Sequence, residues 1–533
     1  MQLKSNLHTA YKSKKLLSVV VLISIFIIGI FVRTYKFDEI PSGLNQDEAS
    51  IGYEAFSILT TGADRNGYSY PIHFISWGSG QNALYAYLTI PFVHFWGLNT
   101  FSVRIVNVLF SIIALFLFYL IAKQHFKEKS FLYFSVFLFA INPWSIMSAR
   151  WGLESNIFPT IILIAVFFII KAIKKNIFYL LPASAFLSLS LYSYGTSYFF
   201  VPIFIVGIIL FIKLREKVEF PILIISALIF VLLSLPILKF IVINHFGLTS
   251  EYSSFIAIPK LDSNRTSAIF NLFSDDFFNE FIKNIARVSV ILFGQTDNNL
   301  YNSIPQSGTI YHISLFFAAI SIYNYFRDKS SRTLISSLFI IWLIVALTMS
   351  IMIHSNINRL NIIFYPLIFF SSDGVYKLVL FLHNSNRKVI FNTVIIVYSI
   401  LFITFASTYF GVLQTEKKST FSKGIGEAII YTNKRFTNET ILVSDDYINM
   451  PYIYTCFYDK IATVKFRKEV VFDNQSSGAF REVSKLGRYV FESSNPNSNY
   501  IMIIHNSELI KFRNTKYTKA TFDDFSIVKV ISK

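Results

Sequence analysis

The chain alternates between long apolar runs and short charged connections over residues 16 to 410. A run of about 17 to 25 apolar residues is what an α-helix needs to cross about 30 Å of hydrocarbon. We count about eleven such runs, which predict spans over residues 16–33, 101–122, 131–148, 156–173, 177–197, 198–214, 220–243, 309–326, 333–353, 360–381 and 389–410. The pattern therefore predicts a polytopic transmembrane helical bundle, a mainly α fold.

The first run follows a cluster of lysines, as the apolar part of a signal peptide does. No small-residue cleavage site comes after it, and the segment continues through Arg33 and Tyr35 into a polar loop. We therefore interpret it as a retained first transmembrane helix.

The orientation is predicted from the basic residues, because short loops rich in Lys and Arg stay in the cytoplasm. When eleven helices are threaded alternately, eighteen basic residues fall on one side: Lys4, Lys12, Lys14, Lys15, Lys123, Lys127, Lys129, Lys171, Lys174, Lys175, Lys213, Arg215, Lys217, Arg327, Lys329, Arg332, Arg387 and Lys388. The pattern predicts a cytoplasmic N-terminus and an extracytoplasmic segment from residue 411 onward.

Two of the predicted outer loops are long, over residues 34–100 and 244–308. Together with the predicted spans they make residues 1–410 one predicted membrane module. Each loop contains an apolar stretch too short to span, ALYAYLTIPFVHFWG and SAIFNLF, which suits a helix lying along the membrane surface. Residues 411–533 change character. Short β-rich runs (ETILVSDD, NYIMIIHN, FSIVKVIS) alternate with helix-like FSKGIGEAIIYTNKRF and EVSKLGRYVFESS, which predicts a small α/β domain.

Composition agrees with a membrane protein and narrows its chemistry. Hydrophobic residues make up 53% and charged residues 15% of the 533 residues, and the mean hydropathy is +0.52. The net charge of +17 lies mostly between apolar runs, without the basic stripe that a nucleic-acid partner requires. Cys456 is the one cysteine, so neither an intrachain disulfide nor a cysteine-based metal site can form.

One pair of adjacent carboxylates follows the first helix closely, in GLNQDEASIGYEA. Asp47 or Glu48 could act there as a general base for an acceptor hydroxyl or amine, or as a metal ligand. The alternative is a solvated loop in which the two carboxylates favour a helix that starts at Ala49.

The context of this pair resembles a known family. After DE come GADRNG with a following Pro, an aromatic surface helix with an internal Pro, and Phe and Arg opening the second helix in FSVRIVNVLFS. This order is similar to the polyprenol-phosphate-sugar-dependent glycosyltransferases of the protein O-mannosyltransferase and aminoarabinose transferase kind, glycosyltransferase family 39 in the broad sense. The resemblance covers about residues 15 to 410 and implies the fold called GT-C.

The resemblance implies roles for six residues. It makes Asp47 the catalytic base with Glu48 beside it, and it places Arg150 and Glu154 of NPWSIMSARWGLESN near the substrate, on one helix face if that segment is helical. Arg359 in HSNINRLNIIFYPLIFF becomes the first candidate for a donor phosphate contact, since a guanidinium presents a planar fork to phosphate oxygens. Snorkelling to the outer headgroups is the alternative for Arg359. Lys239 is a second candidate.

The implied reaction is transfer of a sugar from a polyprenyl-phosphate donor in the bilayer to an extracytoplasmic acceptor. The acceptor stays open between a protein hydroxyl, a lipid-linked glycan and a cell-wall polymer. Neither a P-loop nor a Rossmann glycine fingerprint is present, in agreement with a donor that is not a nucleotide. No cofactor is implied with certainty, although a divalent metal is compatible with three nearby carboxylates.

Two functions from other classes compete with the enzyme. A transporter or lipid flippase would show internal repeats and charged groups near the bilayer midplane. We find no repeat, and Asp373 and Lys377 are the exceptions in helix interiors that otherwise hold almost no charge. A scaffold that presents the C-terminal domain would not need Asp47 and Glu48 near the membrane. We therefore expect an enzyme.

Overall fold

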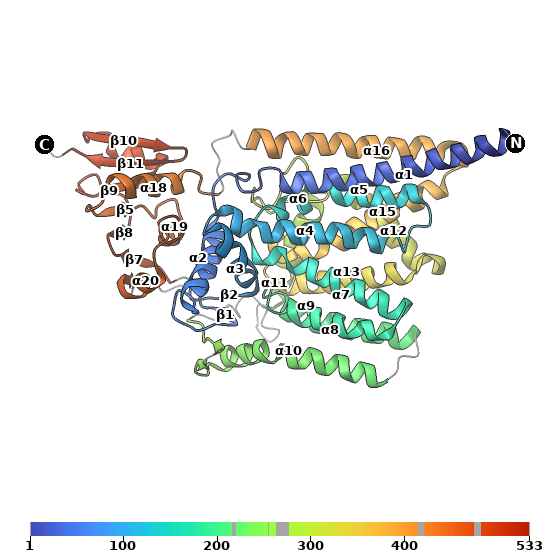
Figure 1. Cartoon of the computed structure of the whole chain (residues 1–533), viewed down its shortest axis with the longest axis horizontal. Helices are drawn as coiled ribbons and strands as arrows, with labels where there is room; N and C mark the ends of the chain where they lie inside the picture. The colour runs from blue at the N-terminus through green and yellow to red at the C-terminus, as the bar shows by residue number, and fades with distance from the viewer. Residues whose placement is uncertain are drawn as a thin grey trace.

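The structure is a computed structural model that describes residues 2–215, 220–253, 255–262, 277–413, 421–473 and 481–531. A long bundle of roughly parallel helices carries a smaller, sheet-containing domain at one end (Figure 1). The N-terminus lies at the opposite end of the bundle from this domain.

The membrane bundle is built from apolar helices, and seven of them are long and apolar enough to cross a membrane in the part of the chain that the structure describes. These seven spans come from α1 (Gln2–Thr34), α4 (Thr100–Ala122), α7 (Phe158–Lys174), α10 (Phe220–Phe246), α13 (Leu334–Met352), α14 (Ile357–Leu360) with α15 (Phe364–Phe381), and α16 (Asn384–Ser407). The multi-pass membrane fold predicted from hydropathy is confirmed.

The four remaining predicted spans are helical but broken or short. The third is bent by 48° between α5 (Lys129–Ala140) and α6 (Pro143–Ala149), where Pro143 opens α6 and the Asn142 side chain caps it. The others are α8 (Leu180–Ser190), α9 (Ser197–Arg215) and α12 (His312–Arg327). At 1.5 Å per residue the 11 residues of α8 rise about 17 Å, roughly half the hydrocarbon thickness.

The two long connections form a layer at the end of the bundle that carries the small domain. The first contains α2 (Gln46–Thr61), β1 (His73–Phe74), β2 (Gln81–Asn82) and α3 (Leu84–Trp96). The second contains β3 (Glu251–Tyr252), β4 (Ala257–Ile258) and α11 (Phe277–Ser289), followed by a π-helical turn over Val290–Gly294. The predicted surface helix in ALYAYLTIPFVHFWG is α3, with Phe95 and Trp96 exposed at its end. The apolar stretch SAIFNLF lies outside the described residues.

Short helical turns lie next to the bundle helices, outside the two long connections. They are η1 (Glu154–Asn156), η2 (Ile177–Tyr179), η5 (Lys329–Ser331), η6 (Asn361–Ile363) and η7 (Thr408–Val412).

The C-terminal region is an α/β unit around a seven-stranded sheet of order β10-β11-β9-β5-β8-β7-β6. Its helices are α18 (Ile425–Arg435), α19 (Pro451–Tyr458), α20 (Thr463–Glu469) and the 3-10 turn η8 (Asn506–Phe512). Its strands are β5 (Ile441–Val443), β6 (Val470–Phe472), β7 (Val483–Leu486), β8 (Tyr489–Phe491), β9 (Ile501–His505), β10 (Tyr517–Phe522) and β11 (Phe525–Val530). β5 pairs in parallel with both β8 and β9, which places it at the centre of the sheet.

The helix predicted over EVSKLGRYVFESS is wrong, because this segment forms the antiparallel pair β7 and β8. Leu486 pairs with Tyr489, so only Gly487 and Arg488 make the turn. Gly487 has φ +59°, a left-handed conformation that two-residue hairpin turns require and glycine adopts without strain. A helical pattern of apolar residues was therefore overridden by one glycine at the turn.

The C-terminal unit packs directly on α2. The Tyr53 hydroxyl donates to the Ile461 carbonyl at 2.9 Å, and Arg467 of α20 donates to the Asp64 carbonyl at 2.6 Å. A single hydrophobic core joins α2 and α3 to α18, α19 and the sheet. The boundary after residue 410 stays a prediction, since two parts that share a core need not fold independently.

The predicted orientation can be tested with cysteine labelling. We expect Lys519→Cys to react with a membrane-impermeant maleimide in intact cells and Lys127→Cys to react only after permeabilisation. Both lysines are exposed, and they lie on the C-terminal unit and in a predicted inner loop. Cys456 is fully buried and can stay in place. Labelling of Lys127→Cys alone in intact cells would reverse the predicted topology.

Candidate active site

The first turn of α2 carries the Asp-Glu pair in a fixed geometry. The Asn45 side chain accepts from the Asp47 backbone N–H at 2.9 Å, and the Glu48 side chain accepts from the Asn45 N–H at 3.0 Å. This reciprocal capping box explains why the helix begins at Gln46. Both carboxylates lie where the helix dipole favours negative charge. The local sequence thus fixes the backbone that presents Asp47.

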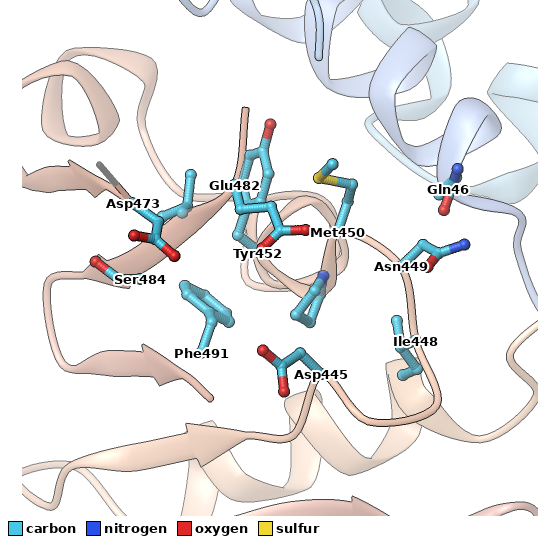
Figure 2. A pocket seen from close by; sticks show the side chains of 12 residues that line it. Gln46, Asp445, Ile448, Asn449, Met450, Tyr452, Asp473, Glu482, Ser484 and Phe491 are labelled. Carbon is cyan, nitrogen blue, oxygen red and sulfur yellow. The ribbon is translucent and has the colours of Figure 1, made fainter. Parts of the chain in front are cut away.

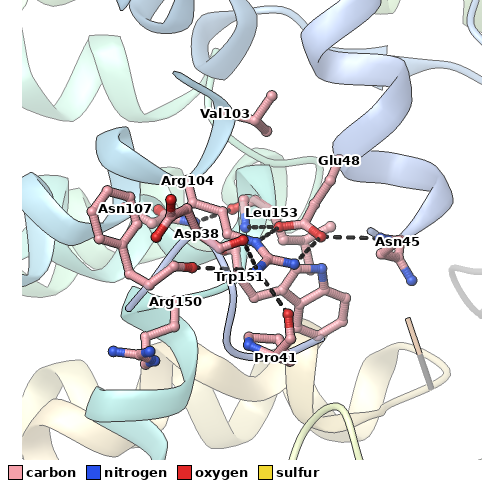
Figure 3. A network of polar contacts seen from close by, with 12 residues as sticks. Asp38, Pro41, Asn45, Glu48, Val103, Arg104, Asn107, Arg150, Trp151 and Leu153 are labelled. Carbon is pink, nitrogen blue, oxygen red and sulfur yellow. Dashed lines mark hydrogen bonds and ion pairs between the residues drawn. The ribbon is translucent and has the colours of Figure 1, made fainter. Parts of the chain in front are cut away.

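Glu48 is completely buried and bound on both of its oxygens (Figure 3). Arg104 of α4 holds it bidentately, with Nε 2.8 Å from Oε1 and Nη2 3.1 Å from Oε2. The Gly152 N–H also donates to Oε1 at 2.8 Å. Because both oxygens already accept hydrogen bonds, the geometry gives Glu48 a positioning role rather than that of a second base.

Arg104 connects this pair to the chain that leaves the first membrane helix. Its guanidinium donates to the carbonyls of Pro41 and Gly43 at 2.9 and 2.8 Å. One buried ion pair therefore ties together α2, α4 and the segment after α1 (Figure 3). In the sequence, Arg104 was noted as the arginine that opens the second predicted helix, but no role was assigned to it.

Arg150 lies near this network and is fully buried (Figure 3). Its guanidinium donates to backbone carbonyls around the end of α1, including Val32 at 3.1 Å and Lys36 at 3.0 Å. It also lies 4.9 Å from the centre of the Phe410 ring. These contacts hold the end of α1 in place, and the predicted substrate contact of Arg150 stays untested.

Glu154 does not share a helix face with Arg150, because α6 ends at Ala149 and Glu154 starts the separate turn η1. The condition for a shared helix face, one helix over both residues, is therefore not met. Glu154 is 7% exposed, and its Oε1 accepts from the Asn82 backbone N–H at 3.3 Å. It lies close to the layer formed by the first outer loop, as a sugar-orienting residue would need to.

Asp47 itself is half-buried, and its charge acts on two tyrosines from distant parts of the chain. Burial, and to a smaller extent the negative charge of Asp47, raises the pKa of Tyr301 above its ordinary value. Asp47 also contributes to raising the pKa of Tyr454 on α19, where burial is again the main cause. Asp47 therefore lies where α2, the 295–311 segment and the C-terminal unit come together.

An aromatic cluster lies beside this meeting point. The Tyr301 ring is centred 5.6 Å from Trp151 and 4.9 Å from Phe421. The three residues come from the turn after α6, the 295–311 segment and the start of the C-terminal unit. Neither Tyr301 nor Phe421 was singled out from the sequence, because no local pattern indicates that they meet.

Buried polar atoms without a hydrogen-bond partner among the described residues occur in the same region. They include Trp151 Nε1, Ser155 Oγ, Ser303 Oγ and Asn361 Oδ1. Asn361 Nδ2 donates to the Ser155 carbonyl at 2.5 Å, which joins η6 to η1. Buried donors and acceptors normally find partners, so such a group of atoms is a candidate surface for a polar ligand.

Arg359 lies in α14, capped by the Asn356 side chain. It is half-buried, and its Nη1 donates to the His354 carbonyl at 2.6 Å. Burial, together with the charges of Arg287 and Arg359, lowers the pKa of His354. The guanidinium groups of Arg287 and Arg359 therefore both lie close to His354. Of the two, the sequence indicated only Arg359.

The 297–302 segment links Arg359 to the neighbourhood of Asp47. Asp297 Oδ2 accepts from the Ile357 backbone N–H at 3.1 Å and from Asn302 Nδ2 at 2.7 Å. Tyr301 of the same segment is one of the two tyrosines whose pKa Asp47 helps to raise. The structure thus brings the predicted base and the predicted phosphate contact to one short stretch of chain.

Lys239 is not part of this arrangement. It lies on α10 at the edge of the bundle (Figure 1), in an ion pair with Glu251 at 2.5 Å. Both side chains are about half exposed, and surface ion pairs of this kind contribute little to stability. We therefore leave Lys239 out of the mechanism below, although its predicted role stays untested.

The described side chains are not arranged to bind a metal ion. Within the described ranges, no group of three or more His, Cys, Asp and Glu residues could hold a metal ion. The carboxylate of Glu48 is already engaged by Arg104. The mechanism below therefore has no step through a metal.

Comparison with solved structures decides the fold. ArnT from Cupriavidus metallidurans, in a crystal structure bound to undecaprenyl phosphate, matches with a TM-score of 0.55 over 97% of this chain and 98% of that one, at 9% identity. This chain has the GT-C fold. The fold class predicted from the resemblance is confirmed.

Two structures of the oligosaccharyltransferase of Archaeoglobus fulgidus share this GT-C fold. The apo form matches with a TM-score of 0.53 and 12% identity over 84% of this chain and 64% of that chain. The archaeal AglB in complex with an inhibitory peptide and a dolichol-phosphate gives 0.50 and 12% over the same shares. At such identities the likeness concerns the fold alone.

Sequence comparison adds a family match in the membrane part. Residues 83–240 match the family described as dolichyl-phosphate-mannose-protein mannosyltransferase. The match covers fewer than half of the 533 residues and runs from α3 into α10, so it includes Arg150 and Glu154. No curated protein sequence matches the chain.

Proposed function

We propose that this GT-C protein transfers a sugar from a polyprenyl-phosphate donor to an acceptor on the outer side of the membrane. The observation that carries the proposal is the position of Asp47. Its half-buried carboxylate stands at a capped helix start at the predicted outer end of the bundle, beside buried polar atoms that have no partner in the described part of the chain.

The kind of donor follows from the location of the site. A polyprenyl tail can stay in hydrocarbon while its phosphate and sugar reach the layer above the bundle. ArnT and AglB, which share the fold, are described in complex with undecaprenyl phosphate and with a dolichol-phosphate. The match of residues 83–240 to a family of dolichyl-phosphate-mannose-dependent enzymes supports the same class of donor.

The reaction is an inverting displacement at the anomeric carbon. Asp47 takes the proton from the acceptor hydroxyl or amine as that atom forms a bond to the anomeric carbon. The bond between the anomeric carbon and the phosphate oxygen breaks, and its electron pair leaves with the polyprenyl phosphate. Arg359, helped by Arg287, stabilises the negative charge of the leaving phosphate.

Glu48 and its neighbours set the geometry of this step. The Glu48–Arg104 pair fixes the first turn of α2 and so holds the Asp47 backbone still. Such positioning matters because a general base acts only within hydrogen-bond reach of the proton that it removes. To Glu154, which lies next to the polar atoms of η1, we assign the role of orienting the sugar.

The test of the proposal uses the full chain in proteoliposomes. Polyprenyl-phosphate sugars are offered one at a time with membrane extracts as a source of acceptor, and the release of polyprenyl phosphate is measured. Release that depends on the protein supports the proposal. If no such donor is consumed while a lipid moves across the bilayer, the chain is a transporter or flippase.

Arg359→Ala is expected to raise the donor KM about tenfold or more, because a charge-assisted hydrogen bond to phosphate is lost. Thermal stability in detergent should hardly change, since the half-buried guanidinium makes one short hydrogen bond. Arg327→Ala is a matched control that removes an exposed arginine from a predicted inner loop. An unchanged donor KM would assign Arg359 to snorkelling at the headgroups.

A further inference from the structure

A cavity of about 240 Å³ lies between the C-terminal unit and the first turn of α2 (Figure 2). Its twelve lining residues are Gln46, Asp445, Ile448, Asn449, Met450, Pro451, Tyr452, Asp473, Glu482, Val483, Ser484 and Phe491. All except Gln46 belong to the C-terminal unit. The cavity is therefore formed where that unit closes on the membrane part.

The cavity reaches the first turn of α2, which carries Asp47. Gln46 lines the cavity and directly precedes Asp47 in the first turn of α2. Tyr452, which lines the cavity, and Tyr454, whose pKa Asp47 helps to raise, lie two residues apart on α19 and so on different faces of this helix. A ligand in this cavity would therefore lie beside the first turn of α2, the turn that carries the predicted base.

The charge of the lining is one-sided. The carboxylates of Asp445, Asp473 and Glu482 face the cavity (Figure 2), and no Lys, Arg or His is among the twelve described residues that line it. Arg481 is directed elsewhere, with its guanidinium 3.6 Å from the Phe472 ring centre and 3.8 Å from the Asp262 carboxylate. A negatively charged ligand would be repelled here.

The remaining lining groups suit a ligand that is rich in hydroxyls. The amides of Gln46 and Asn449 and the Ser484 hydroxyl can donate and accept, and the carboxylates accept. Tyr452 and Phe491 offer aromatic surface to the apolar face of a ring. The volume is below the range of about 300 to 1,000 Å³ that holds drug-sized ligands, so one ring fits rather than a chain.

We propose that this cavity binds a single sugar ring without negative charge, the terminal ring of the acceptor, and presents it to Asp47. The inference rests on the proposed function, which leaves the acceptor open. If the cavity has this role, the acceptor is a glycan rather than an unmodified protein hydroxyl. Acceptors that end in a uronic acid or a phosphorylated sugar are then excluded.

The test measures binding by saturation-transfer NMR on the full chain in nanodiscs. The probes are methyl mannoside, methyl glucosaminide and methyl glucuronide. We expect signals from the first or second probe and none from the glucuronide. The double variant Glu482→Gln with Asn449→Ala should weaken binding about tenfold or more, because it replaces a charged carboxylate acceptor by a neutral amide and removes the Asn449 amide, both at exposed positions.

Glu492→Gln is the matched control, since it neutralises an exposed carboxylate next to Phe491 that does not line the cavity. It should bind the probes as the wild type does. Equal binding of the glucuronide, no binding of either other probe, or unchanged binding in the double variant would overturn the proposal.

A second measurement separates this inference from the function. Release of polyprenyl phosphate is followed as the bound glycoside is added as a surrogate acceptor. If the glycoside binds but no donor is ever consumed, the proposed function fails and the sugar site stands. If donor is consumed with the same glycoside dependence in the double variant, the acceptor site fails alone.

Discussion

Asp47→Asn is expected to lower kcat for sugar transfer by about 10² to 10⁴, the usual loss when general-base catalysis is removed. The amide keeps the size of the carboxylate but cannot take a proton. A base that acts in the transition state affects kcat rather than donor binding, so the donor Kd should stay near that of the wild type.

The structure indicates that this variant will fold. Asp47 is half-buried, and the capping box that starts α2 uses the Asn45 side chain, the Glu48 side chain and backbone N–H groups. The Asp47 carboxylate is not part of that box. A loss of activity in Asp47→Asn would therefore not be explained by loss of the helix start.

Transfer is measured in proteoliposomes, with expression and donor binding alongside. Asp38→Asn is the control, because it makes the same chemical change at an exposed position of the same loop. Full activity of Asp47→Asn would remove Asp47 from the mechanism. If the wild type also consumed no polyprenyl-phosphate sugar, transport would become the first hypothesis.

The second large effect is expected at Arg104, where Arg104→Ala should destabilise the fold by about 3 to 5 kcal/mol. The substitution leaves the Glu48 carboxylate buried without its ion-pair partner and frees the Pro41 and Gly43 carbonyls. A loss of this size is a large part of the free energy of unfolding of most proteins. We expect poor expression and a clearly lower Tm in detergent.

A double-mutant cycle identifies the cause. Glu48→Gln alone should also destabilise, and the combination with Arg104→Ala should cost less than the sum, because the two residues share one ion pair. Lys36→Ala, which breaks the exposed pair with Glu39, is the control and should leave Tm unchanged. Additive effects in the cycle would show that Arg104 and Glu48 act independently.

These two positions also show how far sequence reasoning reaches. Asp47 was predicted from its position after the first helix and from the family resemblance. The helix that the two carboxylates were expected to favour from Ala49 begins at Gln46, because the Asn45 side chain caps it three residues earlier. Glu48 looked equivalent to Asp47 in the sequence. Its partner Arg104 lies 56 residues away, so only the fold distinguishes a buried ion-paired carboxylate from a half-buried one.

For Arg150, too, the sequence could not reveal the contacts that the side chain makes in the fold. A family pattern suggested a substrate contact, while the structure places its guanidinium among backbone carbonyls at the end of α1. Arg287 was not noticed because nothing in its helix sets it apart. Its relevance comes from Arg359 and His354, which approach it from another part of the chain.

The sequence by itself determined the membrane class, the apolar helices, three of the seven strands of the C-terminal unit (β5, β9 and β11) and a helix start close to Asp47. These features depend on hydropathy over one span, on strand patterns of a few residues or on capping within four residues, so neighbouring residues are sufficient to encode them. Only the tertiary structure decided which charges are paired, which helices are broken and which residues surround Asp47. Pairing and burial depend on contacts between segments tens to hundreds of residues apart, such as Tyr53 with Ile461, and no local pattern specifies them.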